Sequence, residues 1–163
     1  LLQRRAVRAC GCVLAVTASL ADHLGTTRAR VLRDGFRASR FERGTTGADP
    51  RARLTDDPAA VIVGYVGRLT TLGMAKGLPA LVDAFARLRD PRLHLCVVGG
   101  PADEARVLGA RWRSLGLPSG HLHLAGEVPP ADVPSWLTAF DVCAMPFPRT
   151  PHFSYDASPL KLF

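Results

Sequence analysis

Two basic side chains, Arg68 and Lys76, flank a short loop and could together bind a diphosphate. Arg68 follows Gly67 at the end of an apolar run, and Lys76 stands beside Gly77 near the predicted start of a helix. A guanidinium offers a planar fork to phosphate oxygens, whereas an ammonium is a movable point charge. Such cations also stabilise the negative charge that develops on a departing diphosphate. The residues alone leave a second interpretation open, in which both are solvated surface cations.

Glycines follow three of the predicted strands and could form the rim of one pocket. These are Gly67, the pair Gly99 and Gly100, and Gly126. Glycine lets a backbone approach a ligand closely, and the free amides at the start of a following helix favour anions. Any one of them could simply make a tight turn, but their repetition along one rim favours a shared pocket.

The elements that would position these residues alternate along the sequence. Alternating strands and helices predict an α/β fold with a Rossmann-like, doubly wound parallel sheet, whose ligands bind beyond the carboxyl ends of the strands. The predicted strands are residues 61–66, 93–98, 122–125 and 142–145, and the predicted helices are a segment from about residue 79, residues 102–115 and residues 132–140. Upstream, residues 3–9 could end a helix, and residues 12–16 predict a short strand. Thr17 or Ser19 could cap a following helix that runs to residue 24.

A change in composition suggests a domain boundary. Residues 42–58 are polar and rich in Gly, Thr, Asp and Arg, as is typical of a linker. We therefore predict that residues 1–44 end an N-terminal domain, that residues 45–59 link, and that residues 60–163 form a second domain.

The net charge of +7 is unevenly distributed and bears on the partners. Residues 1–53 hold 11 Arg and 4 acids, whereas residues 54–163 hold 8 Arg, 2 Lys and 10 acids. The basic part could face an anionic membrane surface, or it could be a solvated Arg-rich surface. Aromatic residues do not interleave with the arginines, so we expect no nucleic acid partner. No apolar run reaches the roughly 18 residues of a membrane span, and we predict a cytoplasmic location with peripheral membrane contact left open.

Several other kinds of site lack their sequence signatures. The loop after Gly67 has no Gly-Lys-Ser/Thr ending of a P-loop, and no GxGxxG turn of a dinucleotide site follows the first strand. Cys10, Cys12, Cys96 and Cys143 lack the CxxC spacing of a zinc site, and we interpret them as buried, reduced thiols.

An ordered set of motifs resembles glycosyltransferase family 4, the retaining group 1 transferases of the GT-B fold. The resemblance covers about residues 60 to 163, and two upstream segments resemble the end of that family's N-terminal domain. The matching segments are Gly64–Leu69, Lys76–Leu78, Val97–Pro101, His123–Pro129 and Ser158–Phe163, preceded by Val16–Ser19 and by Val31–Phe36 with Phe41.

The resemblance implies that residues 60–163 are a donor-binding domain for a nucleotide-diphosphate-sugar, incomplete at its C-terminus. It implies transfer to a hydroxyl acceptor of unknown identity, with no metal and no further cofactor. The residues that it assigns to the donor diphosphate are Gly67, Arg68, Lys76, Ser158 and Leu160, and those that it assigns to the nucleobase are Gly99, Gly100, Gly126 and Val128.

The resemblance also suggests a catalytic acid. The family carries two acids separated by seven residues, and if the second would directly follow Phe163, the first falls on Asp156. In the family the first acid lies by the donor sugar, but aspartate here is one methylene shorter than the usual glutamate. The alternative is a loop carboxylate that is solvated or caps the following turn. A further departure is the loop between Arg68 and Lys76, which is longer than the commonest family pattern.

Three hypotheses about function follow. The first is a fragment of a retaining glycosyltransferase that is inactive as an isolated chain, because donor and acceptor must both be held in line for transfer. The second is a non-catalytic module that binds a nucleotide-sugar or a partner. The third is a GT-B-type sugar-nucleotide epimerase, which would use different acids.

Overall fold

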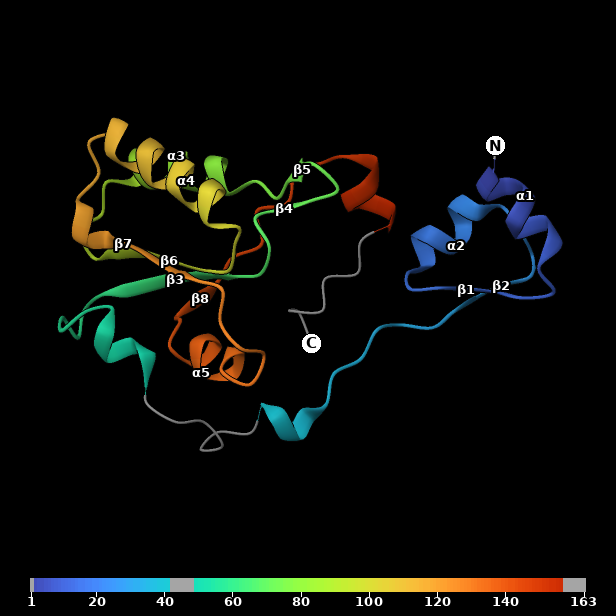
Figure 1. The fold of residues 1–163 in the computed structure, drawn as a ribbon, viewed down its shortest axis with the longest axis horizontal. Coiled ribbons are helices and arrows are strands. Elements are labelled where there is room, and N and C mark those ends of the chain that lie inside the picture. Colours follow the sequence, from blue (N-terminus) through green and yellow to red (C-terminus); the bar gives the residue numbers. More distant parts are fainter. Residues whose placement is uncertain (1, 42–48, 157–163) are drawn as a thin grey trace. The chain divides into compact units, whose positions relative to one another are not determined.

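The computed structural model describes residues 2–41 and 49–156, and the chain divides into two compact units (Figure 1). The first unit combines Leu1–Arg37 with Pro148–Phe163, and the second spans Ala38–Phe147. The boundaries of an N-terminal domain, a linker and a donor-binding domain that we predicted from composition stay predictions.

The second unit is built on a parallel sheet. Within the described residues its strands are β3 (Val61–Val66), β6 (Leu93–Val98), β7 (Leu122–Gly126) and β8 (Val142–Cys143), in the spatial order β7-β6-β3-β8. β3 and β6 pair along their whole length, from Val61 opposite Leu93 to Val66 opposite Val98. Every residue of β6 after Leu93 is buried, which is typical of a parallel strand covered on both faces. The carboxyl ends of the two central strands therefore meet at one edge.

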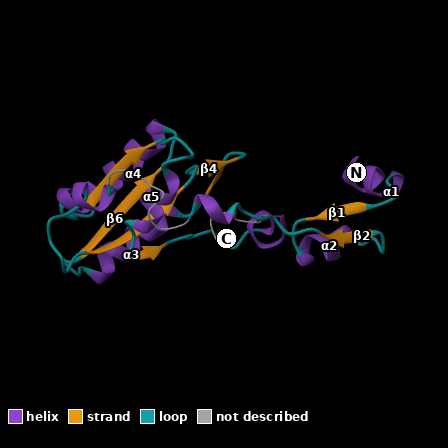
Figure 2. Ribbon diagram, turned by 90° about the horizontal axis from the view of Figure 1, so that it is seen from below, coloured by secondary structure: helices purple, strands orange, loops and turns teal. Residues whose placement is uncertain are grey.

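Helices cover both faces of this sheet (Figures 1 and 2). On one face lie α3 (Leu78–Leu88) and α4 (Ala102–Ser114), and on the other lies α5 (Val133–Thr138). Phe85 of α3 and Trp112 of α4 meet with ring centroids 5.4 Å apart, in the larger of two hydrophobic clusters. The smaller cluster joins β3 and β6 to the α5 side. The predicted α/β fold with a doubly wound parallel sheet is confirmed.

Some elements differ from the sequence prediction. β8 ends at Cys143 instead of residue 145, and Pro146 soon follows, which cannot donate to a neighbouring strand. A small antiparallel hairpin of β4 (Thr70–Thr71) and β5 (Met74–Ala75) was not predicted. Its turn residues Leu72 and Gly73 have φ of 52° and 73°, and leucine rarely adopts that conformation. The usual Asn-Gly or Asp-Gly signal of such a turn is therefore missing.

The described part of the predicted linker belongs to the second unit and packs within it. It contains a 3-10 turn, η2 (Pro50–Arg53), from which the Arg51 guanidinium donates to the carbonyl oxygens of Ala139 and Ala60 at 3.1 and 2.9 Å. Arg51 also pairs with Asp141 at 2.9 Å. The Asp141 carboxylate accepts the Ile62 amide at 2.7 Å, and this bond, followed by the Arg51 guanidinium, lowers its pKa.

The first unit has a short parallel ribbon and small helices. Thr17 caps α2, because its hydroxyl accepts the Leu20 amide at 3.0 Å, and Gly25 ends the helix with a left-handed φ of 60°. The C-terminal segment of the same unit contains η4 (His152–Asp156), which lies against α2. The elements of this unit are α1 (Leu2–Ala9), β1 (Val13–Ala15), α2 (Ala18–Leu24), β2 (Ala29–Val31) and η4; two further short turns, η1 (Ala38–Arg40) and η3 (Ser119–His121), belong to the second unit.

Two sequence-based expectations concern burial. Cys96 is buried in β6, but Cys10, Cys12 and Cys143 are exposed, so the interpretation of buried thiols is wrong for these three. Cys10 and Cys12 precede β1 outside any helix or strand, and Cys143 lies on an edge strand. In the described part of the chain, no helix is long and apolar enough to cross a bilayer.

Three histidines stack at the end of the sheet where β6 and β7 begin. His94 of β6 is 7% exposed, and its Nδ1 lies 3.1 Å from Nε2 of His123 on β7. The His94 ring also stacks on that of His121, with centroids 4.2 Å apart. Burial lowers the pKa of both His94 and His123, and repulsion by neighbouring histidines lowers it further, while Asp57 acts in the opposite direction on His94. The native stack therefore favours neutral rings.

We expect this stack to make folding sensitive to acid. The unfolded chain binds protons near its usual histidine pKa of about 6.5, before the native state does, so the free energy of unfolding falls as pH drops below that value. Urea unfolding at about pH 7.5 and about pH 5.5 measures the difference. His94→Gln combined with His123→Gln should reduce the pH dependence. An unaltered pH dependence in the double variant would contradict this explanation.

Candidate functional site

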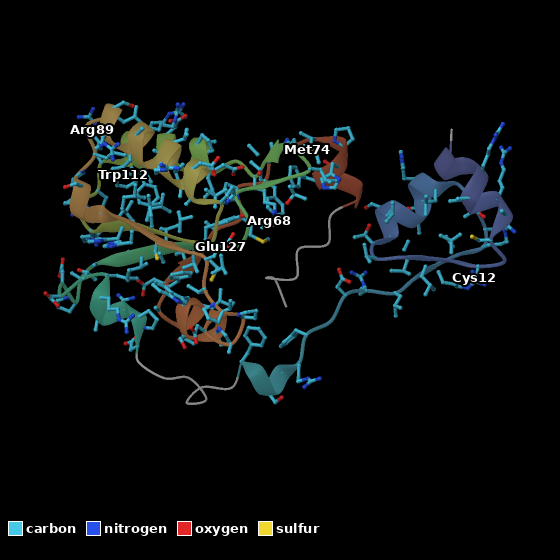
Figure 3. The ribbon with its side chains drawn as sticks, in the orientation of Figure 1. Cys12, Arg68, Met74, Arg89, Trp112 and Glu127 are labelled. Atoms are coloured by element: carbon cyan, nitrogen blue, oxygen red, sulfur yellow. The ribbon has the colours of Figure 1, made fainter. Side chains whose placement is uncertain are left out.

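A groove of about 220 Å³ lies at the carboxyl ends of β3 and β6, and we call it the Arg68 groove. Figure 3 shows Arg68 and Glu127 at this end of the sheet, away from Arg89. Five residues that the sequence predicted for donor binding line it, together with three valines and one acid. The predicted ones are Gly67, Arg68, Gly99, Gly100 and Val128, and the others are Val66, Val98, Val133 and Glu127.

The floor of the groove is made of closely packed strand ends. The Gly67 amide donates to the Val98 carbonyl at 2.8 Å, and the Gly99 amide donates to the Gly126 carbonyl at 2.7 Å. Gly99 has a φ of 139°, and a Cβ there would collide with the carbonyl oxygen of Gly67. Only glycine fits at this position without moving the end of β3. Gly126 thus contributes a carbonyl that fixes the rim and is not among the groove-lining residues.

Lys76 lies close enough to Arg68 for their charges to interact. Burial lowers the pKa of the Lys76 ammonium, and the positive charge of Arg68 lowers it further. The ammonium lies 6.0 Å from the ring centroid of Phe147, within reach of a cation–π attraction. Two neighbouring cations repel each other, and an anion that binds both removes this repulsion.

The backbone directly after Lys76 is closely packed. Gly77 has a φ of 82°, and a Cβ there would collide with the carbonyl oxygen of Pro146. The backbone therefore passes tightly under the segment after β8 before α3 begins at Leu78. Lys76 consequently leaves the hairpin at a defined point.

The remaining predicted site residues lie elsewhere. Asp156 is the last residue of η4 in the first unit. Ser158 and Leu160 lie outside the described residues. The structure thus brings Gly67, Arg68 and Lys76 together with the glycines of the neighbouring strand ends, and the assignments of all these residues to a donor stay predictions.

Glu127 is a groove residue that the sequence analysis did not select. Its Oε1 would lie 2.7 Å from a Cβ on Gly100, so its carboxyl group closes one side of the groove against the backbone. An ionised carboxylate only accepts hydrogen bonds, and it can therefore receive N–H or O–H groups of a ligand. Its place between Gly126 and Val128 in the matched motif was the signal that could have identified it. In the part of the chain that the structure describes, no group of three or more His, Cys, Asp or Glu side chains could hold a metal ion.

The site combines two cations with glycine-rich strand ends, and comparison with known proteins gives it a family. Residues 60–161 match the family described as group 1 glycosyl transferases. The chain belongs to this family. The match includes every groove-lining residue and Lys76.

One relative in sequence and two solved structures are similar to this chain. The chain is 34% identical over 106 residues to a D-inositol 3-phosphate glycosyltransferase of Mycolicibacterium gilvum (strain PYR-GCK). The matched region covers 65% of this chain and 21% of that protein. The fold of this chain is similar to that of Anabaena Alr3699/HepE, solved in complex with UDP and glucose. The TM-score is 0.68 and the sequence identity 23%, and the match covers 88% of this chain and 40% of that one. A glycosyltransferase from Rickettsia africae ESF-5 gives a TM-score of 0.66 and 16% identity, over 81% of this chain and 37% of that one.

The comparisons confirm the family and the fold class that the motifs indicated. The chain spans about a fifth of the length of the Mycolicibacterium gilvum protein and about 40% of the Anabaena Alr3699/HepE chain.

The repulsion between the two cations can be measured on Lys76. We expect Arg68→Ala to raise the pKa of Lys76, because the variant removes the neighbouring positive charge. NMR titration of reductively ¹³C-methylated lysines reports this pKa, and loss of one signal in Lys76→Arg assigns it. Arg113→Ala, which removes an exposed arginine of α4, serves as the control and should leave the titration unchanged. An equal pKa in the wild type and in Arg68→Ala would show that the two charges do not interact.

Proposed function

We propose that the chain is the donor-binding portion of a retaining glycosyltransferase. In this proposal the enzyme transfers a sugar from a nucleotide-diphosphate-sugar to a hydroxyl acceptor, and the isolated chain does not turn over. The observation that carries the proposal is the electrostatic interaction of Arg68 with Lys76 beside a groove of glycine-rich strand ends. The complex of Anabaena Alr3699/HepE with UDP and glucose, whose fold this chain shares, supports a donor of this class.

Arg68 and Lys76 would act on the leaving group. As the bond between sugar and diphosphate breaks, negative charge grows on the diphosphate, and two fixed cations stabilise that charge. The two side chains place positive charge next to the developing negative charge. We therefore propose that the reaction needs neither a metal nor a further cofactor. The backbone around Gly99, Gly100 and Val128, with Gly126 behind it, would border the nucleobase.

The remaining parts of the proposal rest on the resemblance and on charge. Asp156 would lie by the donor sugar, and Ser158 and Leu160 would approach the phosphate and the sugar. The acceptor would be held by a part of the protein that this chain does not include. A cytoplasmic location, with peripheral contact to an anionic membrane, stays a prediction from the basic first third of the sequence.

The diphosphate assignment predicts a loss of nucleotide affinity when both cations are removed. In the full-length protein that contains this chain, Arg68→Ala combined with Lys76→Ala should weaken binding of UDP or GDP by about 100-fold or more, because two charge-assisted interactions are lost. Isothermal titration calorimetry measures the binding affinity of both nucleotides. Arg113→Ala removes a cation from the exposed face of α4 and should bind as the wild type does. Unchanged affinity in the double variant would show that the diphosphate binds elsewhere.

The proposed role of Asp156 predicts a different kind of defect. Asp156→Asn should lower kcat of the full-length enzyme by about 100-fold or more while changing the donor KM much less, because the side chain would act mainly on the reacting sugar. Asp22→Asn on α2 removes an exposed carboxylate from the same unit and is the matched control. Full transferase activity in Asp156→Asn would remove this residue from catalysis.

A further inference from the structure

A set of hydrogen bonds lies beneath the loop that carries the two cations. The hydroxyl of Tyr65, a fully buried residue of β3, donates to the carbonyl oxygen of Arg68 at 2.5 Å. The hydroxyl of Thr70 on β4 donates to Oε1 of Glu104 at 2.6 Å. Glu104 belongs to the first turn of α4, so the two bonds fasten the loop to the sheet and to a helix.

The backbone of the same loop is tied at two further points. The Leu69 amide donates to the Gly100 carbonyl at 2.9 Å, and the Lys76 amide donates to the Leu69 carbonyl at 3.0 Å. Between these ties the chain makes only the small β4–β5 hairpin, whose tip residue Leu72 is 84% exposed. A hairpin of this size is not stable by itself. Its geometry, and with it the distance between Arg68 and Lys76, therefore depends on the anchors.

The burial of Glu104 costs folding free energy, which a purely stabilising role would not explain. Its second oxygen, Oε2, is buried and has no hydrogen-bond partner within the described residues. Leaving a buried polar atom unsatisfied is unfavourable, and a charged one more so. The negative charge of Glu104 also acts on Tyr65, since burial first and this carboxylate second raise the pKa of Tyr65 to about 12. The tyrosine hydroxyl thus keeps its proton and remains a donor to Arg68 at all physiological pH values.

We propose that Tyr65, Thr70 and Glu104 form a brace that holds Arg68 and Lys76 in the arrangement that binds a diphosphate. The proposal rests on the proposed function, and the three are positioning residues because none of them lines the Arg68 groove. Tyr65 fixes the backbone of Arg68 from the sheet side. Thr70 and Glu104 fix the hairpin through which the chain passes from Arg68 to Lys76.

A brace and a merely structural contact differ in what they do to two related ligands. Poor placement of the cations weakens binding of a nucleoside diphosphate more than binding of the monophosphate with the same base, because the monophosphate offers less charge to the pair. A general loss of stability lowers the melting temperature and leaves the ratio of the two affinities unchanged. The affinity ratio of diphosphate to monophosphate is therefore the informative quantity.

The test uses Tyr65→Phe, Thr70→Val and Glu104→Ala in the full-length protein that contains this chain. The ligands are whichever of UDP or GDP the wild type binds and the matching UMP or GMP, measured by calorimetry alongside the melting temperature. Each variant should lower diphosphate affinity about three- to tenfold, the effect of one lost hydrogen bond, with monophosphate affinity nearly unchanged. The double variant Thr70→Val with Glu104→Ala should bind the diphosphate no more weakly than either single variant, because both substitutions remove the same hydrogen bond. Thr70→Ser, which keeps the hydroxyl, should restore affinity.

Matched controls come from neighbouring positions. Thr71→Val changes the adjacent threonine of the same strand, and Asp103→Ala removes the adjacent carboxylate of the same helix turn, and both should bind like the wild type. If the brace variants lost diphosphate and monophosphate affinity equally, or lost only stability, the proposal would be overturned. If the wild type and Arg68→Ala differed in UDP affinity while the brace variants did not, the brace would be wrong and the proposed function would stand. If the wild type bound neither UDP nor GDP, the proposed function would be wrong and the brace would fall with it.

Discussion

The repulsion between Arg68 and Lys76 is the constraint on which the site depends. The structure brings the two cations near enough that the charge of one lowers the pKa of the other, and burial of Lys76 adds to the cost. A fold gains nothing from this arrangement while the site is empty. An anion bound to both cations, as in the proposed function, would offset this cost and would favour a ligand with two neighbouring negative groups. The surrounding structure can be understood as the means of holding the cations there.

The sheet supplies one half of that support. Because β3 and β6 pair in register over their whole length, Gly67 and Gly99 arrive together at the same edge. The absence of a side chain at Gly99 lets the two ends close to contact, and Arg68 begins directly beyond them. The groove is thus a consequence of strand register and of glycine at one position. The segment after β7 adds Glu127 and Val128 to its lining.

Much of this could be predicted from the sequence, and the failures have identifiable causes. Residues 61–66 and 93–98 are short apolar runs, and glycines follow both of them, so the sequence favoured two central strands. The β4–β5 hairpin was missed because its turn places leucine, and not asparagine or aspartate, at a left-handed φ. The exposure of Cys143 follows from the edge position of β8, which local hydrophobicity does not report. Glu104 was missed because only the three-dimensional structure shows that it lies under the hairpin. Glu127 was missed although its place between two predicted site residues was a sequence signal for it.

The hairpin itself connects the sequence to the brace. The loop between Arg68 and Lys76, which the sequence analysis expected to be longer than the commonest family pattern, contains the strands β4 and β5. A longer loop loses little in closure entropy, but it allows the two cations to move independently unless something orders it. Two pairs of strand residues cannot do so alone, and the loop is instead bonded to β3 through Tyr65 and to α4 through Glu104. The buried, unsatisfied oxygen of Glu104 is then explained as a cost of fixing this loop at Thr70. A side chain that reaches from the first turn of α4 to Thr70 can direct only one of its two oxygens toward the hydroxyl.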